Sequence, residues 1–198
     1  GEKFVIRGKS GSGKTTILNA LMGVYPPCEG EILFNGTRVD SKTIGQVRTA
    51  LSYIAQEPLL GTETVEEALY LPFTFKVNRD RKPNRKTLIQ TLHKLQLAED
   101  ILRAESSTLS GGEKQRITIA RALLLGKEVF ILDEVTSALD PESKQAVLSL
   151  FSDEAFTILS VSHDPDWFTI CDTFIDVGDG KILNVHQKDD GEAYHEHH

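Results

Sequence analysis

Short runs of β-branched, aromatic and aliphatic residues recur along the chain and alternate with stretches of helical pattern. Several of these runs are apolar throughout, as is typical of strands that are covered on both faces. Strands that alternate with helices predict an α/β fold built around a mainly parallel sheet. The expected strands lie at residues 4–7, 31–34, 51–55, 129–133, 156–162 and 173–178.

Two segments depart from this alternation. Asn35 and Gly36 lie between two strand-like pieces, and an Asn-Gly pair is typical of a tight hairpin turn. From about residue 62 to residue 107 the pattern is helical, with Leu88, Leu92 and Leu95 on one face. We therefore expect a small antiparallel β-hairpin region and an inserted helical subdomain. The chain then divides into a discontinuous core of residues 1–58 and 107–185, a helical subdomain of residues 59–106 and a flexible polar tail of residues 186–198.

Composition narrows the function classes. The 198 residues are 39% hydrophobic and carry a formal net charge of −7, which argues against a duplex nucleic-acid binder, so no nucleic acid is expected as a partner. With only Cys28 and Cys171, a reducing cytoplasm is favoured over a disulfide framework. The sequence contains neither a signal peptide nor an apolar run near the roughly 20 residues that span a bilayer. Any membrane role is expected to depend on a partner.

A glycine-rich stretch, GKSGSGKTT, follows the first strand directly and precedes a helical pattern. It matches G-x-x-x-x-G-K-[ST] in the strand–loop–helix context of a phosphate-binding loop. Backbone amides of such a loop point at phosphate oxygens, and the helix N-terminus adds partial positive charge. Lys14 is expected to reach the β- and γ-phosphates, and the Thr15 hydroxyl to bind Mg²⁺. The candidate ATP-binding residues are Gly8, Ser10, Gly11, Ser12, Gly13, Lys14, Thr15 and Thr16.

Two adjacent carboxylates stand at the end of an apolar run. Asp133 closes the strand 129–133, and Glu134 follows at once. A strand that ends in Asp is the arrangement that holds Mg²⁺ opposite a phosphate loop, usually through a water. Glu134 could then accept a proton from the water that attacks the γ-phosphate. The alternative is that both carboxylates only cap the following turn.

Three further polar residues stand where strands end or helices begin. Gln56 follows the strand 51–55 and is a candidate neutral ligand of the metal or of water. His163 closes another strand at the edge where α/β sites gather, and it is a candidate contact for the γ-phosphate or the water. Asp140 opens an Asp-Pro-Glu sequence, so a purely structural helix cap and a functional role both stay open.

The stretch TLSGGEKQR has two interpretations. Ser110 followed three residues later by Glu113 predicts a capping box at a helix start. Capping does not explain Gly111 and Gly112, each of which costs roughly 1 kcal/mol relative to Ala inside a helix. The glycines favour the second interpretation, in which the helix N-terminus approaches a phosphate held by another molecule.

In combination these motifs resemble the ATP-binding subunit of ABC transporters, over residues 1–185. The matching pieces are the phosphate loop, Gln56 of the Q-loop, the LSGGE signature, the Walker B run VFILDE, the SALD D-loop with Asp140 and the switch residue His163. The resemblance implies a RecA-like P-loop ATPase core that uses ATP and Mg²⁺. It implies catalytic roles for Glu134, His163, Gln56 and Lys14, and Mg²⁺ contacts from Thr15, Gln56 and Asp133. It also implies a head-to-tail dimer, with a second copy or a related subunit, in which Ser110, Gly111, Gly112 and Glu113 of one chain face the ATP of the other.

The resemblance further implies a membrane-spanning subunit on a separate chain, which docks on residues 57–75 and places this chain on the inner face of the cell membrane. The stretches LYLPFTFKVNRDRKP and DEVTSALD are similar to bacterial ATPases of iron or metal export. The basic stretch 76–86 is expected to be a solvated loop, or else a contact for anionic lipid headgroups. His195, His197 and His198 suit a terminal tail or tag remnant better than a metal sensor.

Two alternatives to a transporter subunit stay in view. The first is a non-transport ABC ATPase of the DNA-repair, chromosome or translation type; the short spacing from Gln56 to Ser110, without sustained heptads, argues against the coiled-coil forms. The second is a regulatory module that no longer hydrolyses ATP, against which Glu134 and His163 argue.

Family members also carry, before the phosphate loop, an aromatic residue that stacks on adenine. Seven residues precede Gly8 here, so what stacks on adenine stays open.

Overall fold

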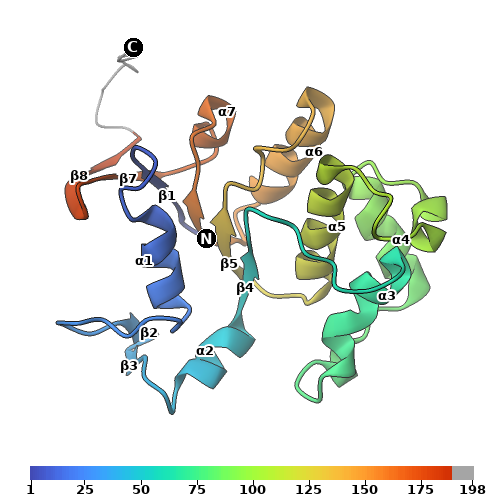
Figure 1. The fold of residues 1–198 in the computed structure, drawn as a ribbon, viewed down its shortest axis with the longest axis horizontal. Helices are drawn as coiled ribbons and strands as arrows, with labels where there is room; N and C mark the ends of the chain where they lie inside the picture. Colours follow the sequence, from blue (N-terminus) through green and yellow to red (C-terminus); the bar gives the residue numbers. More distant parts are fainter. Residues whose placement is uncertain (189–198) are drawn as a thin grey trace.

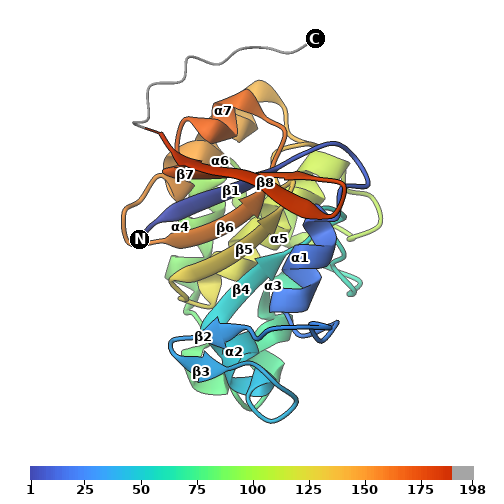
Figure 2. The ribbon, with the colours of Figure 1, turned by 90° about the vertical axis from the view of Figure 1, so that its left-hand side faces the viewer.

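A six-stranded sheet with the order β4-β5-β6-β1-β7-β8 forms the centre of the computed structural model, which describes residues 1–188 (Figures 1 and 2). Neighbouring strands from β4 to β7 pair in parallel, and β8 pairs antiparallel with β7 at the edge. The predicted α/β fold with a mainly parallel sheet is confirmed. The strands are β1 (Lys3–Arg7), β4 (Leu51–Ile54), β5 (Val129–Asp133), β6 (Thr157–Val161), β7 (Thr173–Gly178) and β8 (Lys181–Gln187).

Both faces of this sheet are covered, because consecutive apolar residues of a strand point to opposite sides. In β5, Phe130 and Leu132 belong to a large core with α5 (Gly111–Leu124) and α6 (Pro141–Phe151). Ile131 belongs to a smaller core with Leu18 of α1 (Lys14–Leu21) and Val47 of α2 (Ile44–Ala50). Figure 2 shows α1 in front of the sheet. The continuous apolar runs of the sequence therefore have a physical cause in this two-sided burial.

The predicted hairpin is a separate two-stranded sheet of β2 (Leu33–Phe34) and β3 (Thr37–Arg38). Its turn residues, Asn35 and Gly36, have φ of 50° and 76°, as a primed two-residue turn requires. The expected strand 31–34 thus shortens to two residues and lies outside the main sheet.

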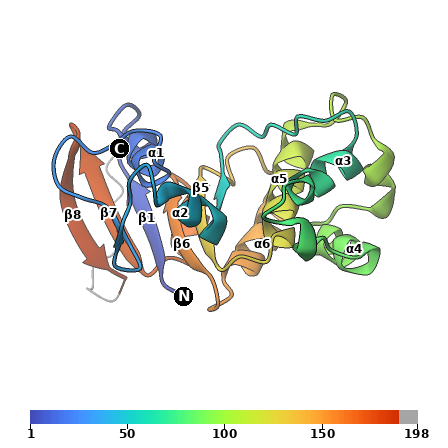
Figure 3. The same cartoon turned by 90° about the horizontal axis from the view of Figure 1, so that it is seen from below.

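The segment after β4 is helical, as predicted. It contains α3 (Val65–Tyr70), the 3-10 turns η1 (Leu71–Thr74) and η2 (Arg79–Arg81), α4 (Arg85–Lys94) and the 3-10 turn η3 (Glu99–Arg103). Leu88, Leu92 and Leu95 are fully buried in the large core. Figure 3 shows α3 and α4 beside α5, away from β7 and β8.

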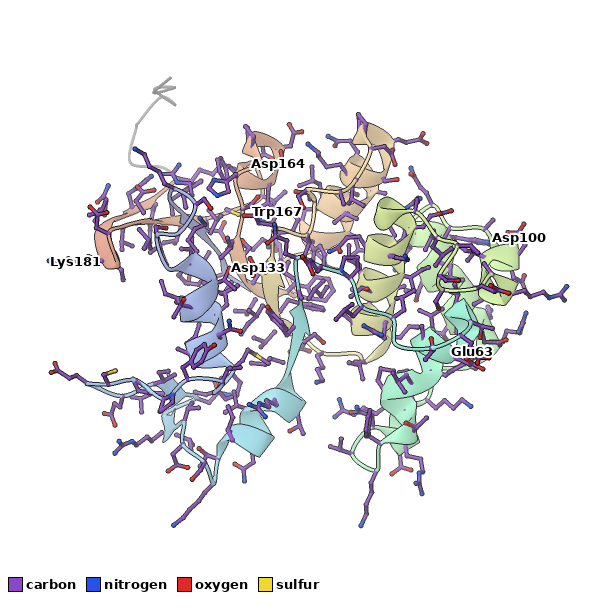
Figure 4. The ribbon with its side chains drawn as sticks, in the orientation of Figure 1. Glu63, Asp100, Asp133, Asp164, Trp167 and Lys181 are labelled. Atoms are coloured by element: carbon purple, nitrogen blue, oxygen red, sulfur yellow. The ribbon has the colours of Figure 1, made fainter. Side chains whose placement is uncertain are left out.

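The chain after β6 is anchored by α7 (Pro165–Phe168), whose Trp167 is fully buried (Figure 4). The indole Nε1 donates to Ser160 Oγ at 2.9 Å, and Ser160 Oγ donates to the carbonyl of Phe4 at 2.9 Å. This chain of hydrogen bonds fixes α7 against β6 and β1. In residues 1–188 no helix has the length and apolar character needed to cross a membrane.

Strand β8 was not predicted, and the prediction that the polar tail begins at residue 186 was wrong for its first two residues. His186 and Gln187 belong to β8, and the His186 ring stacks on Phe174 with centroids 5.3 Å apart. Asp179 and Gly180 form the turn, with φ of 48° and 71°. Residues 189–198 of the predicted tail, with His195, His197 and His198, lie outside the described residues.

Candidate functional site

The phosphate loop connects β1 to α1 at the carboxyl end of the sheet. Gly8 has φ of 151°, and a Cβ at this position would collide with the carbonyl oxygen of Val177 on β7. Lys14 is buried, and its Nζ donates to the carbonyls of Gly8 at 2.7 Å and Lys9 at 3.1 Å. The ammonium group therefore braces the loop from the inside.

Asp133 lies in the middle of the molecule between α1 and β4 (Figure 4), and its carboxyl is close to the Thr15 hydroxyl at the start of α1. Its side chain is almost fully buried, and its Oδ1 has no hydrogen-bond partner among the described residues. Burial raises the pKa of this carboxyl, against the opposing effect of the Thr15 hydroxyl, while the charge of Glu134 adds to the increase and Lys14 counters it. An orphaned carboxylate oxygen beside a hydroxyl is a donor set that suits a hard divalent cation.

The raised pKa of Asp133 predicts a pH-dependent stability difference for Asp133→Asn. A carboxyl whose pKa is higher in the folded state stabilises the fold at low pH and loses that contribution as pH rises above the ordinary value near 3.8. We therefore compare the melting temperatures of the variant and the wild type without nucleotide or metal. The difference, variant minus wild type, should increase by a few degrees between pH 4 and pH 7. Calorimetry over this range measures it. Asp80→Asn, at an exposed site, is the control and should show no such trend; a flat difference for both variants would contradict the assignment.

Glu134, Gln56 and His163 come together from the segments that follow β5, β4 and β6. The Gln56 Nε2 donates to Glu134 Oε2 at 3.0 Å, and His163 Nε2 lies 3.7 Å from Glu134 Oε1. Glu134 has φ of 46°, unusual for a non-glycine residue, and its backbone N–H donates to Val161 on β6 at 2.9 Å. Strained backbone of this kind costs of order 1–3 kcal/mol and is typical of functional positions. Gln56 therefore holds one carboxylate oxygen, and the His163 ring faces the other, at the carboxyl edge of the sheet.

A second polar network was missed by the sequence analysis. Thr136 donates to Asp164 Oδ2 at 2.9 Å, and Lys144 Nζ of α6 lies 2.9 Å from the same oxygen. Asp164 follows His163 directly and also caps α7. The network ties the loop after Glu134 to the loop that carries His163. Residues 136, 144 and 164 meet only through the strand order, and no local signal in the sequence pairs them.

Asp140 is the N-cap of α6. Its Oδ1 accepts from the Ser143 backbone N–H at 3.0 Å and its Oδ2 from the Ser143 hydroxyl at 2.6 Å. These two hydrogen bonds from Ser143 hold the pKa of the exposed Asp140 carboxyl below its ordinary value. The structural role is therefore present; a further role toward a second chain stays a prediction.

The signature segment begins α5 and contains the predicted capping box. The Ser110 Oγ accepts from the Glu113 N–H at 3.2 Å, and Glu113 Oε2 accepts from the Ser110 N–H at 2.8 Å. A Cβ on Gly112 would lie 3.0 Å from the Ala138 carbonyl, so this glycine has a packing reason inside the chain. Gly111 meets nothing within 4 Å. The argument that the glycines serve a phosphate of another molecule thus rests on Gly111.

The chain does not bring all predicted site residues together. The phosphate loop, Asp133, Glu134, Gln56 and His163 gather around the start of α1. The signature at the start of α5 contacts the loop after Glu134 instead, and Figures 1 and 3 show α5 and α1 well apart. One chain therefore holds a phosphate loop and, at a distance from it, the N-terminus of α5 with the signature segment.

Comparison with known proteins assigns the family. The family model described as "ABC transporter" matches residues 1–137 of this chain. The chain belongs to the ABC transporter family. This match confirms the predictions of an ABC-type ATP-binding subunit that hydrolyses ATP to drive transport, with a RecA-like P-loop fold.

Relatives of this ABC subunit include ATP-binding proteins of an iron export system and of energy-coupling factor transporters. The chain is 35% identical to the probable iron export ATP-binding protein FetA of Escherichia coli, over 88% of this chain and 78% of that protein. It is 33% identical to the energy-coupling factor transporter ATP-binding protein EcfA1 of Mycoplasmopsis synoviae, over 92% of this chain and 70% of that protein. Among solved structures, a dimeric post-hydrolysis state of the ATP-binding cassette MJ0796 with ADP and Pi superposes with a TM-score of 0.79 at 28% identity, over 94% of this chain and 85% of that one.

Proposed function

We propose that this ABC subunit binds ATP with Mg²⁺ between two chains on the inner face of the cell membrane and couples hydrolysis to a membrane-spanning partner. The observation that carries the proposal is the division of the site: one chain gathers the phosphate loop and the acidic cluster but keeps its signature apart. A head-to-tail pair supplies each phosphate loop with the signature of the other chain. The dimeric structure of the MJ0796 relative supports this arrangement. The proposal keeps residues 1–58 and 107–185 as the core and 59–106 as the helical subdomain.

The residues present fit Mg²⁺. Asp133 offers the orphaned buried Oδ1, and Thr15 offers a hydroxyl beside it. Gln56, which now donates to Glu134, is the third candidate, through its amide oxygen. When bound, the ion would neutralise charge on the phosphate oxygens. Asp133 and Thr15 would therefore hold it, directly or through water, at the start of α1.

Glu134 is the proposed general base. Its two carboxylate oxygens face Gln56 and His163, so the side chain is oriented before any nucleotide arrives. In the ATP-bound pair, Glu134 takes the proton of the attacking water, and His163 contacts the water or the γ-phosphate. Lys14 turns from the loop carbonyls toward the β- and γ-phosphates. The protein contributes mainly position and charge, as phosphoryl transfer requires.

The membrane-spanning partner is proposed to dock near residues 57–75. Of the apolar residues in this segment, Leu60, Leu69 and Phe73 are buried core, whereas Leu59 and Phe75 are 79% and 59% exposed. The two exposed residues are the ones available to a partner. The cargo is chosen by that partner, and the 35% identity to an iron export protein supports the metal-export subgroup.

Gly111→Ala tests the shared site. In the single chain, Ala at this position meets no atom within 4 Å and favours the helix, so stability should stay equal or rise by up to about 1 kcal/mol. In the ATP-bound pair, the added methyl blocks close approach of the α5 N-terminus to the phosphate. ATP-dependent dimerisation, measured by light scattering, should weaken by about tenfold or more.

The matched control is Gly45→Ala in α2, which also meets open space and lies away from the site. It should leave dimerisation unchanged. If Gly111→Ala and the control dimerise equally, the signature does not take part in the shared site. The ATPase assignment is tested separately, by the ATP turnover of the wild type.

A further inference from the structure

Positive charge is concentrated in a loop of residues 76–82, which lies between η1 and α4 and contains η2. We call it the basic loop. Its cationic residues are Lys76, Arg79, Arg81 and Lys82, and its single carboxylate is Asp80. The whole chain has 29 acidic and 22 basic residues, so this excess of positive charge is a local feature.

The four cations of the basic loop are exposed and have no acidic partner. None of them forms an ion pair with any acid of residues 1–188, Asp80 included. Arg85, at the start of α4, differs from them, because it pairs with Glu66 at 3.4 Å and with Glu99 at 2.8 Å. The charges of the loop are therefore available to an anion from outside the chain.

Hydrogen bonds and a ring contact hold the basic loop in one shape. The Asn78 side-chain amide donates to the carbonyl of Pro72 at 3.1 Å, and the Asn78 backbone N–H donates to the carbonyl of Phe75 at 3.0 Å. The Lys82 ammonium lies 4.6 Å from the centre of the Tyr70 ring, a cation–π contact that orients it. Because the backbone is already ordered, the cations can meet a surface together without a large loss of conformational entropy.

The position of the basic loop relates it to the proposed membrane side of the molecule. The loop begins directly after Phe75, the last residue of the segment where the membrane-spanning partner is proposed to dock. Figure 1 shows the connection between α3 and α4 at the lower edge of the view, whereas α1 and α5 begin at the upper side, where the nucleotide site lies. The basic loop therefore continues the proposed partner interface and lies away from the nucleotide.

The composition of the loop fits an anionic lipid surface. Clusters of about four to eight Lys and Arg residues beside a membrane bind anionic headgroups, and each cation strengthens binding by roughly fivefold. Val77, among the cations, is apolar and 58% exposed, as is typical of a side chain that enters the boundary between headgroups and acyl chains. Mobile headgroup phosphates can reach cations at any spacing, whereas an acidic protein segment would need carboxylates that match the fixed positions of Lys76 and Lys82.

We propose that the basic loop lies on the anionic headgroups of the bilayer beside the membrane-spanning partner. Its four cations pair with lipid phosphates, and Val77 enters the interface between them. The proposal rests on the proposed function, which places this chain on the inner face of the membrane, and it adds the lipid itself as a second contact. Of the two expectations for the basic stretch 76–86, it favours the lipid contact over the solvated loop.

The test measures flotation of the full chain with vesicles at low salt, either of phosphatidylcholine alone or of phosphatidylcholine mixed with the anionic lipid phosphatidylglycerol. The wild type should bind the anionic vesicles about tenfold or more strongly than the neutral ones, and added salt should remove this preference. In Arg79→Gln/Arg81→Gln/Lys82→Gln the preference should fall to near unity. The control Lys94→Gln/Arg103→Gln/Lys181→Gln removes the same number of charges from exposed sites elsewhere and should keep the preference.

A second variant, Val77→Trp, reports the insertion directly. The native Trp167 is fully buried, so its emission provides a constant background. With anionic vesicles the emission of the new indole should shift to shorter wavelength, because the ring leaves water for the interface. With neutral vesicles or with soluble glycerol phosphate it should not shift, which separates a bilayer from a free phosphate as the ligand.

Any of three results would overturn the proposal: equal binding of the wild type to both kinds of vesicle, equal loss in the loop variant and its control, or no emission shift of Val77→Trp with anionic vesicles. ATP-dependent dimerisation of the same wild-type sample separates the two claims. Dimerisation without a preference for anionic vesicles refutes the lipid contact alone. A preference for anionic vesicles without ATP-dependent dimerisation refutes the proposed shared ATP site instead.

Discussion

Glu134→Gln is expected to lower ATP turnover by about 100- to 10,000-fold, the usual contribution of a general base, while ATP affinity stays within a few-fold of the wild type. Gln keeps the size and the hydrogen-bonding shape of the side chain but cannot accept the proton of water. It still can pair with Gln56 and His163, which lie 3.0 Å and 3.7 Å from the two carboxylate oxygens. The ATP-bound pair should therefore form and persist.

Two measurements check this result on one sample. Phosphate release gives turnover, and light scattering with and without ATP gives the molecular mass. The variant should shift from monomer to dimer only with ATP. Glu128→Gln neutralises an exposed glutamate at the other end of β5, just before the strand begins. It is the control and should turn over like the wild type.

Wild-type turnover in Glu134→Gln would remove Glu134 from its role as base. A variant that binds ATP without dimerising would instead point to the signature. In that case the proposed shared site between two chains would need revision, rather than the roles of Glu134, Gln56 and His163.

Lys14→Ala is expected to weaken ATP binding by about 10- to 100-fold, because hydrogen bonds to charged groups contribute roughly 1.5–3 kcal/mol. The Lys14 ammonium is the only cationic group seen to brace the phosphate loop in the described chain, through the carbonyls of Gly8 and Lys9. Its removal deletes the positive charge that is proposed to turn toward the phosphates when ATP binds. The variant should therefore lose ATP affinity and the correct placement of the phosphates at the same time.

Titration calorimetry with a non-hydrolysable ATP analogue measures the change. Lys9→Ala provides a matched control in the same loop, since the Lys9 side chain is exposed and only its carbonyl takes part in the bracing. The control should bind within a few-fold of the wild type. Similar losses in both variants would mean that loop charge in general, and not the position of Lys14, sets the affinity.

Local features of the site could be predicted because their physical causes are local. Gly8 to Thr16, the capping box of Ser110 and Glu113, and the cap of α6 at Asp140 all act within a few residues. The strand β5 was predictable for a similar reason, since two-sided burial leaves an uninterrupted apolar run. Strand β8 was not, because it is an edge strand whose Ile182, Leu183 and Val185 are exposed and whose stability comes from β7 and from the stacking of His186 on Phe174.

The sequence by itself determined the phosphate loop, the acidic pair and the type of fold, because each depends on residues that are neighbours along the chain. Only the tertiary structure decided which of them meet. The strand order β4-β5-β6 brings Gln56 and His163 to Glu134, and it joins Thr136 and Lys144 to Asp164. The packing of Gly112 against Ala138 likewise depends on a contact between segments that are distant in sequence. Such contacts are fixed by the burial of both sheet faces at once, which no local pattern records.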